Sequence, residues 1–389
     1  MSARGKMAAE VSRELIEELA CFEADGPLLS LYLPIALKVD ERKQNEIRLK
    51  NLLKEAHSGL EALGMSSVEA GTLTDTVRNA SLDRDMWTAH GGGFAIFAGR
   101  EFLRHVSLPC PVRELAVAGF RFHLKPLIDA LAYRGRFWLL ALSQNDVRLY
   151  TGDGVSLASV DPGAEVPRSL TEVTGRQPAG KQLQYHAGDR GGDVAMYHGM
   201  GAGKDDTKPE IEQFVRAVAD GLERFWKLDD APVVLAGVEH LRWMYRQVSP
   251  SASRVRGEID GNVEHLPEQE LHEQAWRLVR EQLDARRAEA LDRLEHNDPE
   301  TPVSRELGDV VRAARDGRVD TLFIAADIEC WGRFDDSERS IARRDDPLPG
   351  DVDLLDRAAV ESWLKGGQVY VVPAADIPGK AGAIAGLRY

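Results

Sequence analysis

Residues 187–208 read Ala-Gly-Asp-Arg-Gly-Gly-Asp-Val-Ala-Met-Tyr-His-Gly-Met-Gly-Ala-Gly-Lys-Asp-Asp-Thr-Lys and contain six glycines. A short alternating stretch at 181–186 is typical of a strand, while Pro209 and an amphipathic pattern to about Lys227 predict a helix. Loops longer than about 12–15 residues without internal structure are uncommon, and they are usually functional or disordered. We therefore expect this glycine-rich segment either to carry the function or to carry none.

The composition is that of a globular protein with more than one domain. At 389 residues the chain exceeds the size at which a single hydrophobic core usually divides, which predicts two or three domains. No stretch approaches about 18 uninterrupted apolar residues, and the first residues contain no apolar signal region. Cys21, Cys110 and Cys330 match neither a disulfide framework nor a zinc-ligand spacing. A reducing cytoplasm is the expected location.

Charge argues against a protein that coats nucleic acid, because the formal net charge is −14. The least acidic part is residues 121–204, which contain 10 basic and 8 acidic groups and so carry a net +2. That part includes most of the glycine-rich segment. A local contact with RNA is therefore compatible with the charge distribution.

The first two predicted domains each combine helices with strands. Residues 1–120 are expected to form an α/β domain, because an apolar strand at 28–33 is followed by a helical apolar periodicity over 44–63. Residues 121–260 predict a three-stranded meander, then the glycine-rich segment, a crossover helix and a buried strand at 232–238.

Residues 261–389 are expected to form a third domain, a small α/β/α sandwich. A long charged helix is predicted over 268–297, and helices and strands alternate after it around a polar loop at 332–351. The predicted fold class is therefore α/β in three domains.

Two kinds of enzyme site were considered for the glycine-rich segment. Residues 199–205 resemble a Walker A motif, but His198 stands where the first glycine is required and Asp205 replaces the Ser or Thr after Lys204. The histidines His186 and His198 lie near several aspartates, yet their spacing matches no recognised metal-ligand pattern. No cofactor and no metal are predicted, and a soluble metal- or nucleotide-dependent enzyme is kept as an alternative.

The order of segments resembles the archaeo-eukaryotic peptide-chain release factor and Pelota superfamily, and most of all its bacterial branch, often called baeRF. The resemblance covers roughly residues 121–389. The stretches that carry it are the meander at 137–160, the glycine-rich segment with the helix at 210–226, the strand Val233–Val238 and the C-terminal run 353–389. The first domain is similar only in short phrases such as Tyr32-Leu33-Pro34.

The resemblance implies an RNase H-like middle domain, an L7Ae-like C-terminal domain and a ribosomal partner, with contacts to rRNA and peptidyl-tRNA. The superfamily's C-terminal domains often contact a translational GTPase, which is therefore a candidate partner. The lack of a long apolar stretch predicts no membrane partner. In the superfamily a Gly-Gly-Gln loop enters the peptidyl transferase centre, where its glutamine places a water against the peptidyl-tRNA ester. Here Gly191 and Gly192 are followed by Asp193, which only accepts hydrogen bonds when ionised.

The site residues implied by the resemblance all lie in the glycine-rich segment or directly before it. Gly191 and Gly192 are the candidate catalytic residues, acting through their backbone, because glycine allows close approach and N–H groups stabilise an oxyanion. The expected RNA or ribosome contacts are His186, Arg190, Tyr197, His198, Gly199, Gly201, Gly203 and Lys204.

A second glycine pair, in Gly366-Gly367-Gln368, matches the release-factor signature itself. It stands between a predicted helix at 353–365 and a β-rich run at 368–373. A glycine that ends a helix and a glutamine that opens a strand explain it without chemistry. We therefore predict a structural role for these three residues.

The sequence thus predicts a ribosome-associated factor that occupies the A site in termination or rescue, with peptidyl-tRNA hydrolysis as its candidate activity. Because Asp193 replaces glutamine, a non-catalytic occupant that protects idle ribosomes, a hibernation or stress factor, is the alternative.

Overall fold

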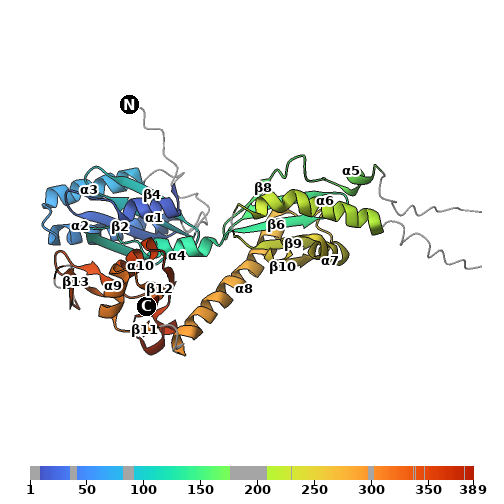
Figure 1. Ribbon diagram of the computed structural model, residues 1–389. Coiled ribbons are helices and arrows are strands. Elements are labelled where there is room, and N and C mark those ends of the chain that lie inside the picture. Colours follow the sequence, from blue (N-terminus) through green and yellow to red (C-terminus); the bar gives the residue numbers. More distant parts are fainter. Residues whose placement is uncertain are drawn as a thin grey trace, which may run out of the picture. The chain divides into compact units, whose positions relative to one another are not determined.

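The computed structural model describes residues 9–35, 42–81, 92–175, 208–228, 230–296, 302–335, 337, 339–345, 347–380 and 382–389. The chain forms two compact units: unit 1 comprises residues 1–134 and 284–389, and unit 2 comprises residues 135–283 (Figure 1). The mixed α/β class is confirmed. The finer division after residues 120 and 260, and the RNase H-like and L7Ae-like assignments, stay predictions.

The N-terminal half of unit 1, residues 9–134, is built on a five-stranded sheet. Its strand order is β1-β4-β3-β2-β5. The strands are β1 (Ala9–Glu10), β2 (Leu28–Pro34), β3 (Gly93–Ala98), β4 (Leu103–Leu108) and β5 (Leu115–Gly119). The helices are α1 (Arg13–Ala20), α2 (Arg42–Ala62), α3 (Ser67–Ala80) and α4 (Lys125–Arg134).

Alternation along β2 decides which face of this sheet each helix covers. Leu29, Leu31 and Leu33 pack with α2 and α3, whereas Leu28 and Tyr32 face the core that contains α1. Successive side chains of a strand point to opposite faces, so one apolar strand supports two layers.

The C-terminal half of unit 1, residues 284–389, contains two small sheets. The four-stranded sheet has the order β11-β17-β12-β16 and the three-stranded sheet the order β14-β13-β15. The strands are β11 (Val303–Ser304), β12 (Val319–Ala325), β13 (Trp331–Asp335), β14 (Ser340–Arg343), β15 (Val352–Asp353), β16 (Gln368–Val372) and β17 (Ala383–Leu387). The helices are α9 (Leu307–Arg315) and α10 (Leu354–Leu364), with 3-10 turns at Ala374–Asp376 and Pro378–Lys380.

The predicted polar loop at 332–351 is wrong, because β13 and β14 form an antiparallel hairpin there. Along β13 the residues alternate between exposed and buried, and Phe334 is one of the buried ones. Charged residues occupy the solvent face and hide this period of two in the composition.

The two halves of unit 1 share one hydrophobic core. A single cluster contains side chains of both, among them Leu15, Phe97 and Leu127 of the first half and Val310, Leu322 and Leu355 of the second. Helix α4 contacts both α10 and β16. The two segments therefore form one body although unit 2 separates them in the sequence.

Unit 2 is a five-stranded sheet with helices on both faces, in the order β10-β9-β6-β7-β8. The strands are β6 (Phe137–Leu142), β7 (Val147–Gly152), β8 (Leu157–Val160), β9 (Val233–Gly237) and β10 (Val255–Asp260). The helices are α5 (Leu170–Thr174), α6 (Lys208–Trp226), α7 (Glu239–Val248) and α8 (Glu268–Glu295), with a 3-10 turn at Ala252–Arg254; α8 continues into unit 1.

Alternation along β6 explains the layers of unit 2. Trp138, Leu140 and Leu142 belong to the cluster that contains α6 and α7, whereas Phe137 and Leu139 belong to the cluster that contains α8. The meander β6-β7-β8 is antiparallel, and β6, β9 and β10 are parallel to one another.

The structural role of Gly366-Gly367-Gln368 is confirmed. Gly366 follows α10 with a φ of +78°, a left-handed conformation that favours glycine after a helix, and Gln368 opens β16. The strand predicted at 181–186 lies outside the described residues, while β5 and β10 were not predicted.

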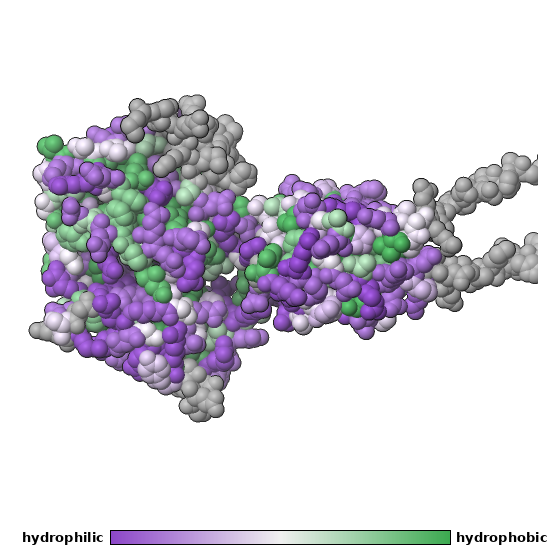
Figure 2. All heavy atoms as spheres, turned by 45° about the horizontal axis from the view of Figure 1, so that its top comes forward, coloured by the Kyte–Doolittle hydropathy of each residue, from purple (hydrophilic) through white to green (hydrophobic). Residues whose placement is uncertain are grey.

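The surface gives no sign of a membrane-spanning helix. Figure 2 shows hydrophilic and hydrophobic residues interspersed over the drawn face of each unit. In the part of the chain that the structure describes, no helix is long and apolar enough to cross a membrane.

Replacing Gly237 with alanine is expected to destabilise unit 2 by more than about 2 kcal/mol. Gly237 ends β9 with a φ of +155°, and a Cβ there would overlap the carbonyl oxygen of Leu142. Gly261→Ala is the matched control, because Gly261 has a φ of +121° in the same unit but open space around it. Urea denaturation followed by tryptophan fluorescence measures both, and equal losses would show that the close approach of Gly237 to Leu142 does not matter.

Candidate functional site

The parallel strands of unit 2 end at one edge of the sheet, here called the carboxyl edge. Leu142, Gly237 and Asp260 are the last residues of β6, β9 and β10, and both strand pairs keep them in register. Ligand sites of open α/β sheets form beyond the carboxyl ends of such strands. The carboxyl edge is therefore the first place to look for a site.

A pocket of about 170 Å³ lies at the carboxyl edge. It is lined by the β6–β7 turn at 143–145, by Val238 and Leu241 at the start of α7, and by the loop 261–264 after β10. Among the described residues that line it, Glu264 is the single ionisable side chain, and hydroxyl and amide groups dominate the polar lining. Such a lining suits a polar, uncharged group.

Side-chain hydrogen bonds make the β6–β7 turn rigid. The Ser143 hydroxyl accepts the N–H groups of Asn145 and Asp146 at 3.2 and 2.9 Å and donates to the Asp146 carbonyl at 3.1 Å. The Asn145 amide donates to Glu264 at 2.9 Å, which links the turn to the loop after β10. The Arg148 guanidinium adds a second link, because it pairs with Asp146 and donates to the Val263 carbonyl.

Arg242 holds the ends of β9 and β10 against α7. It is 9% exposed, and it donates to the Gly237 carbonyl at 2.8 Å and to Asp260 at 2.6 Å. Its remaining contact is an ion pair with Glu258, which Arg246 shares. The carboxyl edge is thus preorganised by charge-assisted bonds.

Both described flanks of the glycine-rich segment start from this edge. The Leu170 N–H, in α5, donates to the Gln144 carbonyl at 2.7 Å, so α5 lies beside the pocket. Helix α5 ends at Gly175, which has a φ of +67°, and it packs against α6, which begins at Lys208. Figure 1 shows α5 and the start of α6 at the same end of unit 2.

The predicted site residues lie in 176–207, outside the described residues. They are His186, Arg190, Gly191, Gly192, Tyr197, His198, Gly199, Gly201, Gly203 and Lys204. They stay predictions. The structure contributes the position of the two flanks from which this segment departs.

Sequence reasoning missed the loop at 261–264, because the strand before it was not recognised. The signal was present: residues 255–260 alternate, and Gly261-Asn262 is a turn pair. The turn at 144–146 was anticipated, but its proximity to the later loop depends on the parallel pairing of distant strands.

The described part of the edge favours binding over covalent chemistry. The Ser143 hydroxyl is engaged within its turn, and none of the described residues that line the pocket is a histidine that could activate it. Among the described residues, no group of three or more His, Cys, Asp or Glu is placed to hold a metal ion.

A family model described as bacterial archaeo-eukaryotic release factor family 3 matches residues 136–318. This range begins at the start of unit 2 and contains the whole carboxyl edge and residues 176–207. No curated protein matches the chain.

Solved structures with similarity include the archaeal translation termination factor aRF1, at 15% identity and a TM-score of 0.25, covering 98% of this chain and 99% of that one. Archaeoglobus fulgidus Pelota is 16% identical with a TM-score of 0.34, covering 76% and 79%. A model of ribosome-bound archaeal Pelota and ABCE1 is 13% identical with a TM-score of 0.38, covering 76% of each chain.

Identities and TM-scores this low carry no argument, so only the family match is used below. That match spans the meander, the glycine-rich segment with its helix and the strand β9, whereas the C-terminal run 353–389 lies outside it. Residues 136–318 are therefore similar to the bacterial archaeo-eukaryotic release factor family 3, which agrees with the resemblance seen in the sequence.

Proposed function

We propose that this protein is a cytoplasmic, ribosome-associated factor that enters the A site and acts in translation termination or ribosome rescue. The observation that carries the proposal is the family match over residues 136–318. Its partners in this role are rRNA and peptidyl-tRNA, with a translational GTPase for delivery.

In this proposal the segment 176–207 reaches toward the peptidyl-tRNA ester from the carboxyl edge of unit 2. A rigid origin favours such a role, because a catalytic segment gains from a well-positioned base. The links from Arg242 to Gly237 and from Asn145 to Glu264 make the edge rigid. Backbone N–H groups of Gly191 and Gly192 are the proposed oxyanion donors.

A second function is favoured by one sequence observation, the aspartate that follows these glycines. An ionised Asp193 cannot donate a hydrogen bond, and it would face the phosphate groups of RNA and tRNA. In this alternative the protein occupies the A site of idle ribosomes and protects them without releasing peptide. No observation in the described residues favours the metal- or nucleotide-dependent enzyme.

The protein is expected to sediment with 70S ribosomes in sucrose gradients of cell lysate, in growing or starved cells. Charge reversal at Arg190 and Lys204 should weaken this association at least about tenfold, because each cation lost removes a phosphate contact. Arg78→Glu on α3 is the control, since Arg78 is exposed and pairs with Asp75 of the same helix. Sedimentation as free protein in both growth conditions would contradict the proposal.

Peptidyl-tRNA release on purified ribosomes separates the two functions. If the glycine backbone is catalytic, Gly191→Ala and Gly192→Ala should each lower release by about tenfold or more, while sedimentation with ribosomes is retained. Asp193→Gln should raise release, because the amide supplies a donor and removes the negative charge.

Binding without release, in both the wild type and Asp193→Gln, would leave the protective function as the correct one. Loss of binding in the glycine variants would instead show that these residues hold the complex together.

A further inference from the structure

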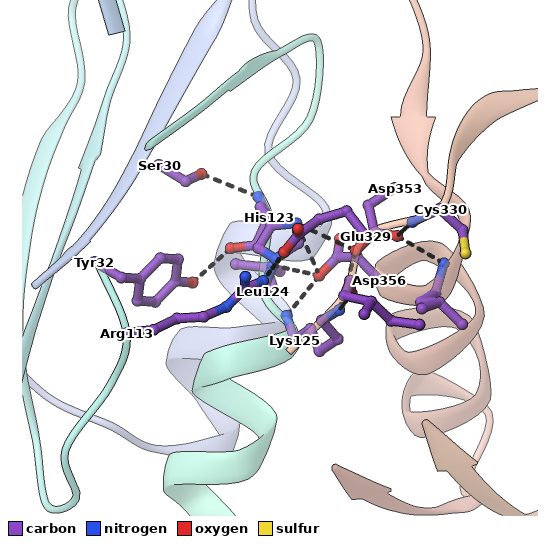
Figure 3. A network of polar contacts seen from close by, with 12 residues as sticks. Ser30, Tyr32, Arg113, His123, Leu124, Lys125, Glu329, Cys330, Asp353 and Asp356 are labelled. Atoms are coloured by element: carbon purple, nitrogen blue, oxygen red, sulfur yellow. Dashed lines mark hydrogen bonds and ion pairs between the residues drawn. The ribbon is translucent and has the colours of Figure 1, made fainter. Parts of the chain in front are cut away.

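A buried polar seam joins the two halves of unit 1 (Figure 3). At its centre Asp356 of α10 accepts the N–H groups of Leu124 and Lys125, at 2.7 and 2.5 Å, through one carboxylate oxygen. These N–H groups start α4 and have no partner within that helix. A carboxylate of the C-terminal half thus caps a helix of the N-terminal half.

A buried ion pair reinforces the seam. The Lys125 ammonium lies 3.2 Å from an Asp353 oxygen and donates to the Ile328 carbonyl at 2.8 Å, although Lys125 is only 1% exposed. The other Asp353 oxygen accepts the N–H groups of Cys330 and Leu355, both at 3.0 Å. Both charges are therefore compensated inside the protein, as burial requires.

His123 connects the seam to β2. The backbone N–H of His123 donates to the Ser30 hydroxyl at 3.0 Å, and its backbone carbonyl accepts from the Tyr32 hydroxyl at 2.5 Å. Its Nδ1 lies 3.7 Å from Asp356 and 4.0 Å from Asp353, while its Nε2 is buried without a hydrogen-bond partner among the described residues. The buried imidazole thus faces two carboxylates.

Burial shifts the pKa values of His123 and Asp356 in opposite directions. It lowers the pKa of His123, against the pull of Asp356 and Asp353. It raises the pKa of Asp356, and the nearby His123 opposes that rise. Burial also raises the pKa of Tyr32 and of Cys330, so both stay neutral. The charged groups that surround the seam are Arg113, Arg121, Lys125, Asp327, Glu329, Arg343, Asp351, Asp353, Arg357 and Glu361.

We propose that His123 and Asp356 form a proton-compensated joint, in which each group cancels the pH dependence that the other imposes on the contact between the two halves of unit 1. A substitution that removes one of the two groups leaves the other uncompensated and makes the contact depend on pH.

The sign follows from proton counts. When the halves separate, the pKa of His123 returns to about 6.5, and the imidazole takes up a proton below that pH. Because its pKa is lowered in the joint, His123 weakens the contact between the halves as the pH falls below about 6.5. The pKa of Asp356 returns to about 3.9, and the carboxyl loses a proton above that pH. Because its pKa is raised in the joint, Asp356 weakens the contact between the halves as the pH rises from about 3.9. Between these two values the contributions oppose each other.

The test measures hydrogen exchange of the Leu124 and Lys125 amides in the full chain between about pH 4 and 7, expressed as protection relative to the intrinsic rate. Asp356→Asn keeps the accepting oxygen and removes the titration. Its protection should fall as the pH decreases below about 6.5. His123→Gln should show the reverse, with protection falling as the pH rises above about 4. Wild type should be flatter than either variant, and the double variant should be flat.

Controls separate the joint from general unfolding. His57→Gln removes a histidine of the same unit that pairs with Glu61 on α2, and it should behave as wild type. Ser30→Ala removes a bond to His123 without a titrating group, and it should lower protection equally at every pH.

Two results would overturn the proposal. One is a single variant, either of the two, whose pH dependence equals that of wild type. The other is protection at Leu124 and Lys125 that changes in step with the Ile96 and Phe323 amides, in the sheets of the two halves, since that would mean that the unit unfolds as a whole. Because each single variant must be steeper than wild type, one folded variant is enough for the test.

Discussion

The capping of α4 by Asp356 is the contact on which the organisation of this chain depends. It brings together segments that lie on either side of unit 2 in the sequence, and it does so at the helix that leads into that unit. Without a partner from the C-terminal half, the first N–H groups of α4 would be buried and unpaired, at a cost of about 1–3 kcal/mol each. Unit 2 is therefore an insertion into a closed unit 1.

Insertion leaves unit 2 with its own two hydrophobic clusters, one on each face of its sheet. Such a unit can hold its geometry without help from the rest of the chain. Its carboxyl edge is tied by Arg242 and by the bond from Asn145 to Glu264, and both flanks of the glycine-rich segment start there. The edge is thus a rigid base for the two described flanks of residues 176–207.

The sequence-based prediction failed for strands in which charged side chains hide the alternation of buried and exposed residues. Residues 332–351 contain so many charged side chains that a polar loop was predicted, yet Gly332 and Phe334 are buried at alternate positions of β13. Strand β10 was missed for a related reason: glutamate and arginine occupy one of its faces, where Glu258 pairs with Arg242 and Arg246. Surface ion pairs supply the polar residues that obscure a half-buried strand.

The sequence by itself determined much of the local structure and the resemblance to the release-factor superfamily. Helical periodicity identified α2, α6, α8 and α10, Gly366 marked the end of α10, and the order of segments indicated the superfamily. These features depend on residues within one turn or one strand of each other, so they can be predicted from the local sequence. Tertiary structure alone decided that residues 9–134 and 284–389 form one unit, and that His123, Lys125, Asp353 and Asp356 meet inside it. No local pattern marks a lysine as buried, because its partner lies more than two hundred positions away and only the folded core removes both from water.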